Sequence, residues 1–197
     1  MIENITDIYL SKNNREEKKE NVEKQVDKKK KTDIYDITVI GLFTALTFLF
    51  TMVNIKLPLG QGGLIHLGNI PLFLGAILFG KKAGSMIGGI GMAMFDVLNG
   101  WVTWAPFTLV VVGLMGFTMG AITSKKKTYS QVILAILVVL LIKIGGYYIT
   151  EVILYHNWVA PVISIPGNIT QIIVAGIVTL LLLEPAKKIV SIFEETN

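Results

Sequence analysis

The chain contains no cysteine and carries little charge for its length. Without cysteine among its 197 residues, it can form neither disulfide bonds nor thiolate metal sites. Charged residues make up 16% of the chain, against about 25% in a typical soluble domain, whereas hydrophobic residues make up 52%. Together with a mean hydropathy of +0.62, this balance is typical of a membrane protein.

Other absences exclude several kinds of function. The two histidines, His66 and His156, are too few for a convincing metal site, and the single arginine, Arg15, excludes an arginine-rich voltage sensor. No GxxxxGK(S/T) phosphate loop is present, which excludes ATP hydrolysis by that mechanism, and HExxH and GxSxG motifs are also absent. The net charge of +4 is modest. We therefore expect no metal, no cofactor and no nucleic-acid partner.

Six apolar segments follow a polar start. Residues 1–33 mix charges of both signs with few apolar residues, which predicts a disordered or solvated tail. The apolar segments cover roughly 35–53, 64–80, 83–99, 105–123, 130–154 and 166–184, and a helix needs about 20 residues to cross the hydrocarbon. The sequence predicts an all-α membrane protein with six transmembrane helices, whose membrane domain covers 34–190 and is followed by a short tail over 191–197.

Lysines between these segments predict the orientation. If all six segments span, eleven lysines lie on one side of the membrane and one, Lys56, lies on the other. The eleven are Lys28–Lys31, Lys81–Lys82, Lys125–Lys127 and Lys187–Lys188. Because cytoplasmic loops carry the excess of positive charge, both termini are predicted to be cytoplasmic.

A lysine inside the fifth segment indicates a polar interior. Lys143 lies within 131–155, and an ammonium at that depth costs about 2.5–3.5 kcal/mol on insertion scales. Tyr147 and Glu151 follow in steps of four residues, on the same helical stripe. The functional interpretation is a binding site, and the alternative is a Lys143–Glu151 pair that only orders helix packing.

Further polar residues cluster near the predicted outer ends of the other helices, where their convergence predicts a small-molecule pocket. The predicted substrate-binding residues are Lys143, Tyr147, Glu151, Asn168, Gln171, Asp96, Asn69, His66 and Trp104. The predicted outer loops also carry Trp101, Tyr155 and Trp158. These aromatic residues fit either an interfacial belt or a lid over the pocket.

Small residues recur at four-residue spacing in the first and third segments. The pairs are Gly41 with Ala45 and Gly84 with Gly88. Such patterns let helix backbones approach closely in lipid. They fit either packing within the chain or a docking face for another membrane protein.

The ordered motifs resemble those of a known family, the substrate-binding S components of energy-coupling factor (ECF) vitamin transporters. The similarity covers 35–188 and is strongest over 66–116, with "PGNITQ" at 166–171 similar to the start of the family's sixth helix. The matching positions are Phe79, Gly80, Gly84, Asp96, Gly100, Pro106 and Thr108. The family's docking motifs are typically alanine-rich, whereas this chain has glycine at three of its four predicted docking positions.

The resemblance implies a multi-pass protein of the bacterial plasma membrane that binds a B-type vitamin or precursor and is not an enzyme. It also implies that the chain lies in membrane lipid and that its protein partners are a transmembrane coupling subunit and two ATPase subunits that energise uptake. Two alternatives remain open from the residues themselves. One is a membrane enzyme using Lys143, Glu151 or Asp96 as acid or base, and the other is a stand-alone secondary transporter. Pyridoxine, the pyrimidine precursor of thiamine, riboflavin and pantothenate all remain possible ligands.

Overall fold

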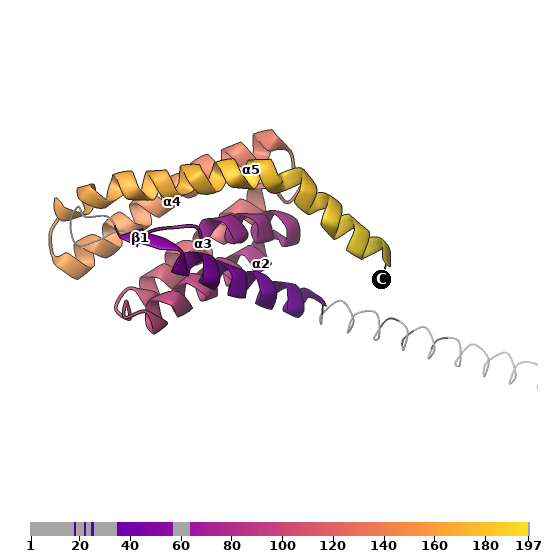
Figure 1. Cartoon of the computed structure of the whole chain (residues 1–197), viewed down its shortest axis with the longest axis horizontal. Coiled ribbons are helices and arrows are strands. Elements are labelled where there is room, and N and C mark those ends of the chain that lie inside the picture. The colour runs from indigo at the N-terminus through magenta and orange to yellow at the C-terminus, as the bar shows by residue number, and fades with distance from the viewer. Residues whose placement is uncertain (1–17, 19–21, 23–24, 26–34, 57–63, 197) are drawn as a thin grey trace, which may run out of the picture. The chain divides into compact units, whose positions relative to one another are not determined.

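The computed structural model describes residues 18, 22, 25, 35–56 and 64–196 (Figure 1). The chain divides into two compact units, Met1–Val39 and Ile40–Asn197. The first unit has few described residues, of which 35–39 belong to the helix Tyr35–Met52. Most of the predicted tail over 1–33 lies outside the described residues, so the predicted division into tails and membrane domain stays a prediction.

Within the described ranges, five helical stretches are long and apolar enough to cross a membrane. They are Tyr35–Met52, α2 (Asn69–Leu98), α3 (Ala105–Ile122), α4 (Tyr129–Tyr155) and the run Ala160–Ile192. The last run combines the short 3₁₀ helix η1 (Ala160–Ser164) with α5 (Ile165–Thr196). These helices confirm the prediction of a helical membrane protein.

Two short strands correct the predicted start of the second segment. β1 (Asn54–Lys56) pairs antiparallel with β2 (Leu64–His66), with Asn54 opposite His66. Residues 64–66 are therefore extended, and the helix begins at Asn69 rather than at 64. The apolar run from 64 was too short to distinguish a strand from a helix end by hydropathy alone.

α2 reverses direction at Gly80. Gly80 has φ 87° and ψ −175°, a left-handed conformation that only glycine adopts readily, and it divides α2 into two arms. Three pairs of residues equidistant from Gly80 lie in contact: Gly84 with Ala76, Gly88 with Leu72, and Gly68 with Met92. In a straight helix Leu72 and Gly88 would be about 24 Å apart. The two arms therefore form an antiparallel hairpin.

Glycines let α3 pack directly on this hairpin. A Cβ at Gly116 of α3 would lie 2.0 Å from the carbonyl oxygen of Gly84, and one at Gly120 would lie 2.5 Å from the backbone nitrogen of Lys81. The core surrounds this contact, with Leu72, Ile87 and Met115 each 0% exposed. Backbone contact of this kind is available only where both helices present small residues.

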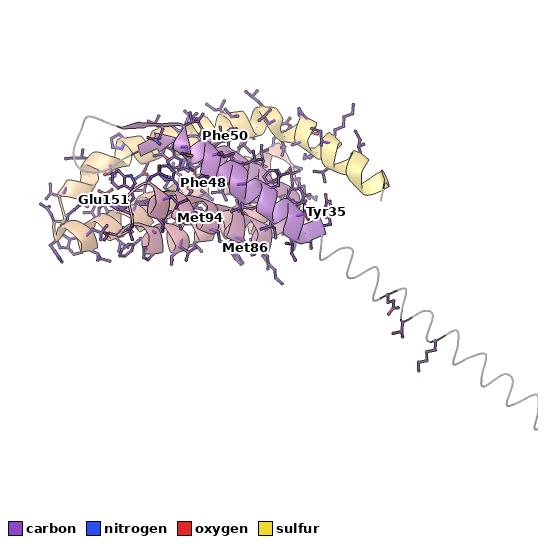
Figure 2. The ribbon with its side chains drawn as sticks, turned by 60° about the horizontal axis from the view of Figure 1, so that its bottom comes forward. Tyr35, Phe48, Phe50, Met86, Met94 and Glu151 are labelled. Atoms are coloured by element: carbon purple, nitrogen blue, oxygen red, sulfur yellow. The ribbon has the colours of Figure 1, made fainter. Side chains whose placement is uncertain are left out.

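The helix that carries Phe48 lies against the same hairpin (Figure 2). Phe43 packs edge-on against Phe79, with ring centroids 5.4 Å apart, and Phe48 packs similarly against Phe95 at 6.5 Å. Phe79 lies beside the Gly80 turn, whereas Phe95 lies near the other end of the second arm. Between Phe43 and Phe48 this helix therefore follows the second arm of the hairpin.

α4 and α5 lie side by side, as the orange and yellow ribbons of Figure 1 show. Gly176 of α5 packs on Ile136 of α4. At one end of the bundle, Lys127 Nζ donates to the carbonyl of Leu78 at 3.0 Å, and Lys187 Nζ donates to the carbonyl of Lys127 at 2.5 Å. These bonds bring the hairpin turn, the α3–α4 connection and α5 together at a lysine-rich end.

Candidate functional site

A cavity of about 80 Å³, lined by both polar and aromatic side chains, lies at the other end of the bundle. Residues from the helix Tyr35–Met52, β2, α2, α3, α4, η1 and α5 contribute to its wall. The lining residues are Thr51, His66, Met92, Phe95, Asp96, Trp101, Trp104, Thr108, Lys143, Tyr147, Glu151, Ser164, Asn168 and Gln171. The cavity therefore gathers side chains that are up to 120 positions apart in the sequence.

Lys143 is buried in the wall of this cavity, with 1% of its surface exposed. Its ammonium donates to Gln171 Oε1 at 3.2 Å and lies 5.2 Å from the centroid of the Tyr147 ring. The one ion pair among the described residues joins Lys187 to Glu184, at the lysine-rich end. Of the three N–H donors of Lys143, one is thus committed to a neutral oxygen, and no carboxylate of the described residues lies within ion-pair distance.

Glu151, labelled in Figure 2, is hydrogen-bonded to a serine rather than paired with Lys143. Its Oε2 accepts a hydrogen bond of 2.8 Å from Ser164 Oγ, at the end of η1. Glu151 is 3% exposed. The Lys143–Glu151 pair, which was the structural alternative for Lys143, is not formed among the described contacts. Glu151 instead joins the end of α4 to η1.

Asp96, Thr108 and Tyr147 form a corner of the cavity built from three helices. The Tyr147 hydroxyl donates to Thr108 Oγ1 at 3.4 Å, and the Thr108 side chain lies beside the Asp96 carboxylate. The second carboxylate oxygen, Asp96 Oδ2, is buried and has no hydrogen-bond partner among the described residues. This corner thus presents an unused acceptor to the cavity.

Aromatic side chains cover the adjoining wall. The Trp104 ring lies 6.3 Å from that of Tyr147 at an interplanar angle of 37°, and it also contacts Trp101 and Tyr155 edge-on. Rings in such clusters prefer offset or edge contacts and leave faces available for a flat ligand. Trp158, in the next loop, is 70% exposed and does not line the cavity.

His66 is held neutral at the cavity wall. Its Nδ1 accepts a hydrogen bond of 3.3 Å from the backbone N–H of Gly68, which places the ring proton on Nε2. Burial, reinforced by the positive charge of Lys143, lowers the pKa of His66 to about 3. At neutral pH the side chain therefore supplies a hydrogen-bonding group without charge.

The structure brings together eight of the nine residues predicted to bind substrate. Asn69 is the exception: it is fully buried at the start of α2, outside the cavity lining. Thr51, Thr108 and Ser164 line the cavity but were not among the predicted site residues. Hydroxyl side chains give little sequence signal because helices tolerate them through bonds to their own backbone, as Thr51 makes to the carbonyl of Thr47.

The four predicted docking residues fall into two groups. Gly84 and Gly88 are buried, and Cβ atoms there would meet Ala76 and Leu72 of the same hairpin at 2.5 Å. Gly41 and Ala45 are exposed, and a Cβ at Gly41 would meet nothing within 4 Å. Gly84 and Gly88 therefore pack within the chain, whereas Gly41 and Ala45 lie on an open helix face.

Comparison with known proteins yields a consistent set of relatives. The family model of the S component of ECF-type riboflavin transporters matches residues 31–188. The thiamine precursor transporter HmpT of Lactococcus lactis is 29% identical over 154 residues, covering 78% of this chain and 87% of HmpT. An uncharacterised protein of Pyrococcus woesei is 34% identical over 111 residues, covering 56% of this chain and 74% of that protein.

Solved structures share the fold. ThiT from Listeria monocytogenes superposes with a TM-score of 0.65 at 18% identity, covering 80% of this chain and 97% of ThiT. The S component of a bacterial ECF transporter superposes with a TM-score of 0.63 at 19% identity, covering 80% of this chain and 98% of that chain.

Proposed function

The chain belongs to the family of S components of ECF-type riboflavin transporters, and from this premise we propose that it is the high-affinity subunit that captures a B-type vitamin or vitamin precursor for uptake. The family consists of transporter components, so the chain is not an enzyme, as predicted. It is a multi-pass protein of the bacterial plasma membrane. The cavity between Asp96, Lys143 and the aromatic wall is the proposed binding site.

The buried Lys143 is the observation that carries this proposal. A fully desolvated ammonium is costly unless its donors find acceptors, and the described contacts supply one neutral oxygen and one aromatic face. The remaining donors lie at the wall of a cavity, where a ligand acceptor would complete their coordination. The cost of burying Lys143 is thus offset most fully when a ligand is bound.

We further propose six spans with both termini in the cytoplasm, because α2 is a hairpin whose arms cross separately. Its first arm has only about 11 residues, or about 16 Å. Most of that arm is buried within the bundle, so protein rather than lipid surrounds it. The hairpin turn brings Lys81 to the same end as Lys127 and Lys187, and the excess of lysine at that end supports a cytoplasmic location.

The exposed face at Gly41 and Ala45 is the proposed docking site for a transmembrane coupling subunit, through which two ATPase subunits energise uptake. Small exposed residues at four-residue spacing allow a partner helix to approach closely. We assign Gly84 and Gly88 to internal packing, because their neighbours belong to this chain.

Ligand binding without turnover is the direct test. The protein, purified in detergent, is titrated with riboflavin, thiamine and the pyrimidine precursor of thiamine, while tryptophan fluorescence reports on Trp101 and Trp104 at the cavity. We expect saturable binding of one molecule per chain and unaltered ligand on release, both measured by native mass spectrometry. Chemical conversion of the ligand, or no saturable binding of any vitamin, would exclude the proposed function.

A further inference from the structure

The corner formed by Asp96, Thr108 and Tyr147 has a polarity that restricts its ligand. The Tyr147 O–H is used to bond Thr108 Oγ1 at 3.4 Å. The Thr108 hydroxyl lies beside the Asp96 carboxylate, and because a carboxylate only accepts, the Thr108 proton is directed toward it. Both hydroxyl protons of the corner are therefore directed toward protein oxygens rather than toward the cavity.

The groups that remain for a ligand at this corner are acceptors. Asp96 Oδ2 is buried and has no hydrogen-bond partner among the described residues, and the phenolic oxygen of Tyr147 retains lone pairs. A buried carboxylate oxygen that stays unbonded is costly, whereas a hydrogen bond to it is charge-assisted and strong. A ligand donor is the group that satisfies this oxygen, while a second acceptor placed there would be repelled.

At Lys143 the cavity favours a ligand acceptor rather than a ligand donor. Its ammonium has donors left over after the bond to Gln171 Oε1, so that part of the wall takes acceptors. The Trp104 and Tyr147 rings, 6.3 Å apart, line the same cavity and favour a flat ring. The cavity thus offers an acceptor from α2, a donor from α4 and an aromatic face.

We propose that Asp96 is a specificity-determining residue that selects ligands with an exocyclic amino group, of the class of small amino-substituted nitrogen heterocycles. This inference rests on the proposed vitamin-binding function and adds the ligand's chemistry to it. The amino group donates to Asp96 Oδ2, and a ring nitrogen or hydroxyl oxygen accepts from Lys143. A ring that presents an oxo group in place of the amino group sets two acceptors against each other and is rejected.

A matched pair of ligands tests this assignment. The full chain is titrated by calorimetry with the hydroxymethyl-aminopyrimidine precursor of thiamine and with its counterpart that carries an oxo group instead of the amino group. For the unaltered protein we expect the amino compound to bind at least about tenfold more tightly, as expected when a buried polar group is left unpaired. Equal affinities would overturn the proposal.

Asp96→Asn provides the second arm of the test. The asparagine amide can present N–H in place of a carboxylate oxygen, so the preference for the amino compound should fall at least tenfold and the oxo compound should bind more tightly than before. A gain for one ligand cannot arise from misfolding. Glu184→Gln, an exposed carboxylate change at the lysine-rich end, is the control and should leave the ratio unchanged. An unchanged ratio in Asp96→Asn would overturn the role of Asp96.

The outcomes separate this inference from the proposed function. Tight binding of riboflavin, which has no exocyclic amino group, together with no binding of either pyrimidine would overturn the role of Asp96 and leave a vitamin-binding subunit. Failure of every vitamin to bind would overturn both. If Asp96→Asn does not fold, the test depends on two other proteins, the unaltered protein and Thr108→Val. In each, the ratio of the affinities for the amino and oxo compounds is measured. Loss of the Thr108 hydroxyl should weaken the preference for the amino compound by releasing the Asp96 carboxylate.

Discussion

Three charged residues give the cavity its polar character. They are buried or partly buried, so their hydrogen-bonding groups face protein atoms and the cavity rather than bulk water. Lys143, Asp96 and Glu151 come from two helices. Among the described residues each lies beside a neutral polar side chain and has no opposite charge within ion-pair distance. Glutamine, threonine and serine neighbours hold these groups in position without neutralising them. Charges held in this way remain available to a ligand, which is the property a capture site needs.

Replacing the Lys143 ammonium should weaken binding without unfolding the protein. We expect Lys143→Ala to lower affinity for the bound vitamin at least tenfold, or about 1.4 kcal/mol, because the ligand loses its donor. Titration by tryptophan fluorescence measures the change. Lys82→Ala, an exposed residue beside the hairpin turn, is the matched control and should bind normally. A folded Lys143→Ala protein with unchanged affinity would exclude contact between Lys143 and the ligand.

His66 should make the protein less stable in acid. Its pKa falls from 6.5 to about 3 in the folded chain, so the unfolded chain takes up a proton that the folded chain does not. The free energy of unfolding is then unaffected by His66 above pH 6.5 and decreases as the pH falls from there toward 3. At pH 5 the loss is on the order of 1–2 kcal/mol.

The neutral variant His66→Gln should lack this contribution. Thermal unfolding in detergent at pH 7.5 and pH 5 should show a smaller decrease in Tm for His66→Gln than for the unaltered protein. Carboxylates titrate in both proteins, so the difference between the two decreases isolates His66. Equal decreases would mean that His66 is protonated as readily in the folded chain as in the unfolded chain.

At the level of the helices, glycine determines which surfaces meet. The contact between α3 and the α2 hairpin is a backbone contact, with the carbonyl of Gly84 where a Cβ of Gly116 would lie. The same hairpin carries Asp96 on its second arm, and α3 carries Thr108. The approach of these two elements therefore positions the acceptor corner of the cavity.

Replacement of glycine by alanine should destabilise the protein where the glycine packs against another helix and should have little effect where it is exposed. Gly116→Ala should destabilise the protein strongly, because its Cβ would lie 2.0 Å from the Gly84 carbonyl oxygen and the helices must move apart. Gly145→Ala is the matched control, since a Cβ there meets nothing within 4 Å on an exposed face of α4. Thermal unfolding in detergent measures both. A Gly116→Ala protein as stable as Gly145→Ala would contradict the close helix contact.

The whole molecule has two chemically different ends. Lysines from the hairpin turn, the α3–α4 connection and α5 gather at one end, and the cavity with its aromatic wall lies at the other. With the lysine-rich end in the cytoplasm, the cavity lies toward the outside. A binder in this orientation needs work from a partner to move its ligand inward against a gradient.

Uptake should therefore depend on other subunits. Cells that contain this chain alone should bind labelled vitamin without accumulating it, and adding a coupling subunit with two ATPase subunits should give ATP-dependent uptake. Scintillation counting of washed cells measures both. Concentrative uptake by the chain in membranes without a coupling partner would instead favour a secondary transporter.

The docking face should be separable from the binding site. Ala45→Leu adds bulk to an exposed face away from the cavity, so it should fold and bind vitamin normally yet block uptake in the presence of the partners. Leu49→Ala, which removes bulk from another exposed position of the same helix, is the control and should support uptake. Normal uptake by Ala45→Leu would place the docking face elsewhere.

Much of this protein follows from the sequence alone. Hydropathy is a local property, so the apolar runs predicted the helical membrane class, and the ends of α3 and α4 lie within one residue of their predicted positions. A charged residue inside an apolar run is also visible in the local sequence. Lys143 could therefore be identified as a candidate site residue from the free-energy cost of placing its charge in lipid. The ordered motifs over 66–116 sufficed to recognise the family.

Only the tertiary structure decided which groups meet. Helical spacing placed Glu151 on the stripe of Lys143, yet the lysine bonds Gln171 on α5 and the glutamate bonds Ser164 on η1. Small-residue spacing was the same for Gly41–Ala45 and Gly84–Gly88, but only the second pair is buried. Sequence periodicity specifies the face of a helix on which a residue lies. Which residues contact that face depends on how closely the helix backbones approach one another and on where the chain reverses direction, as it does at Gly80.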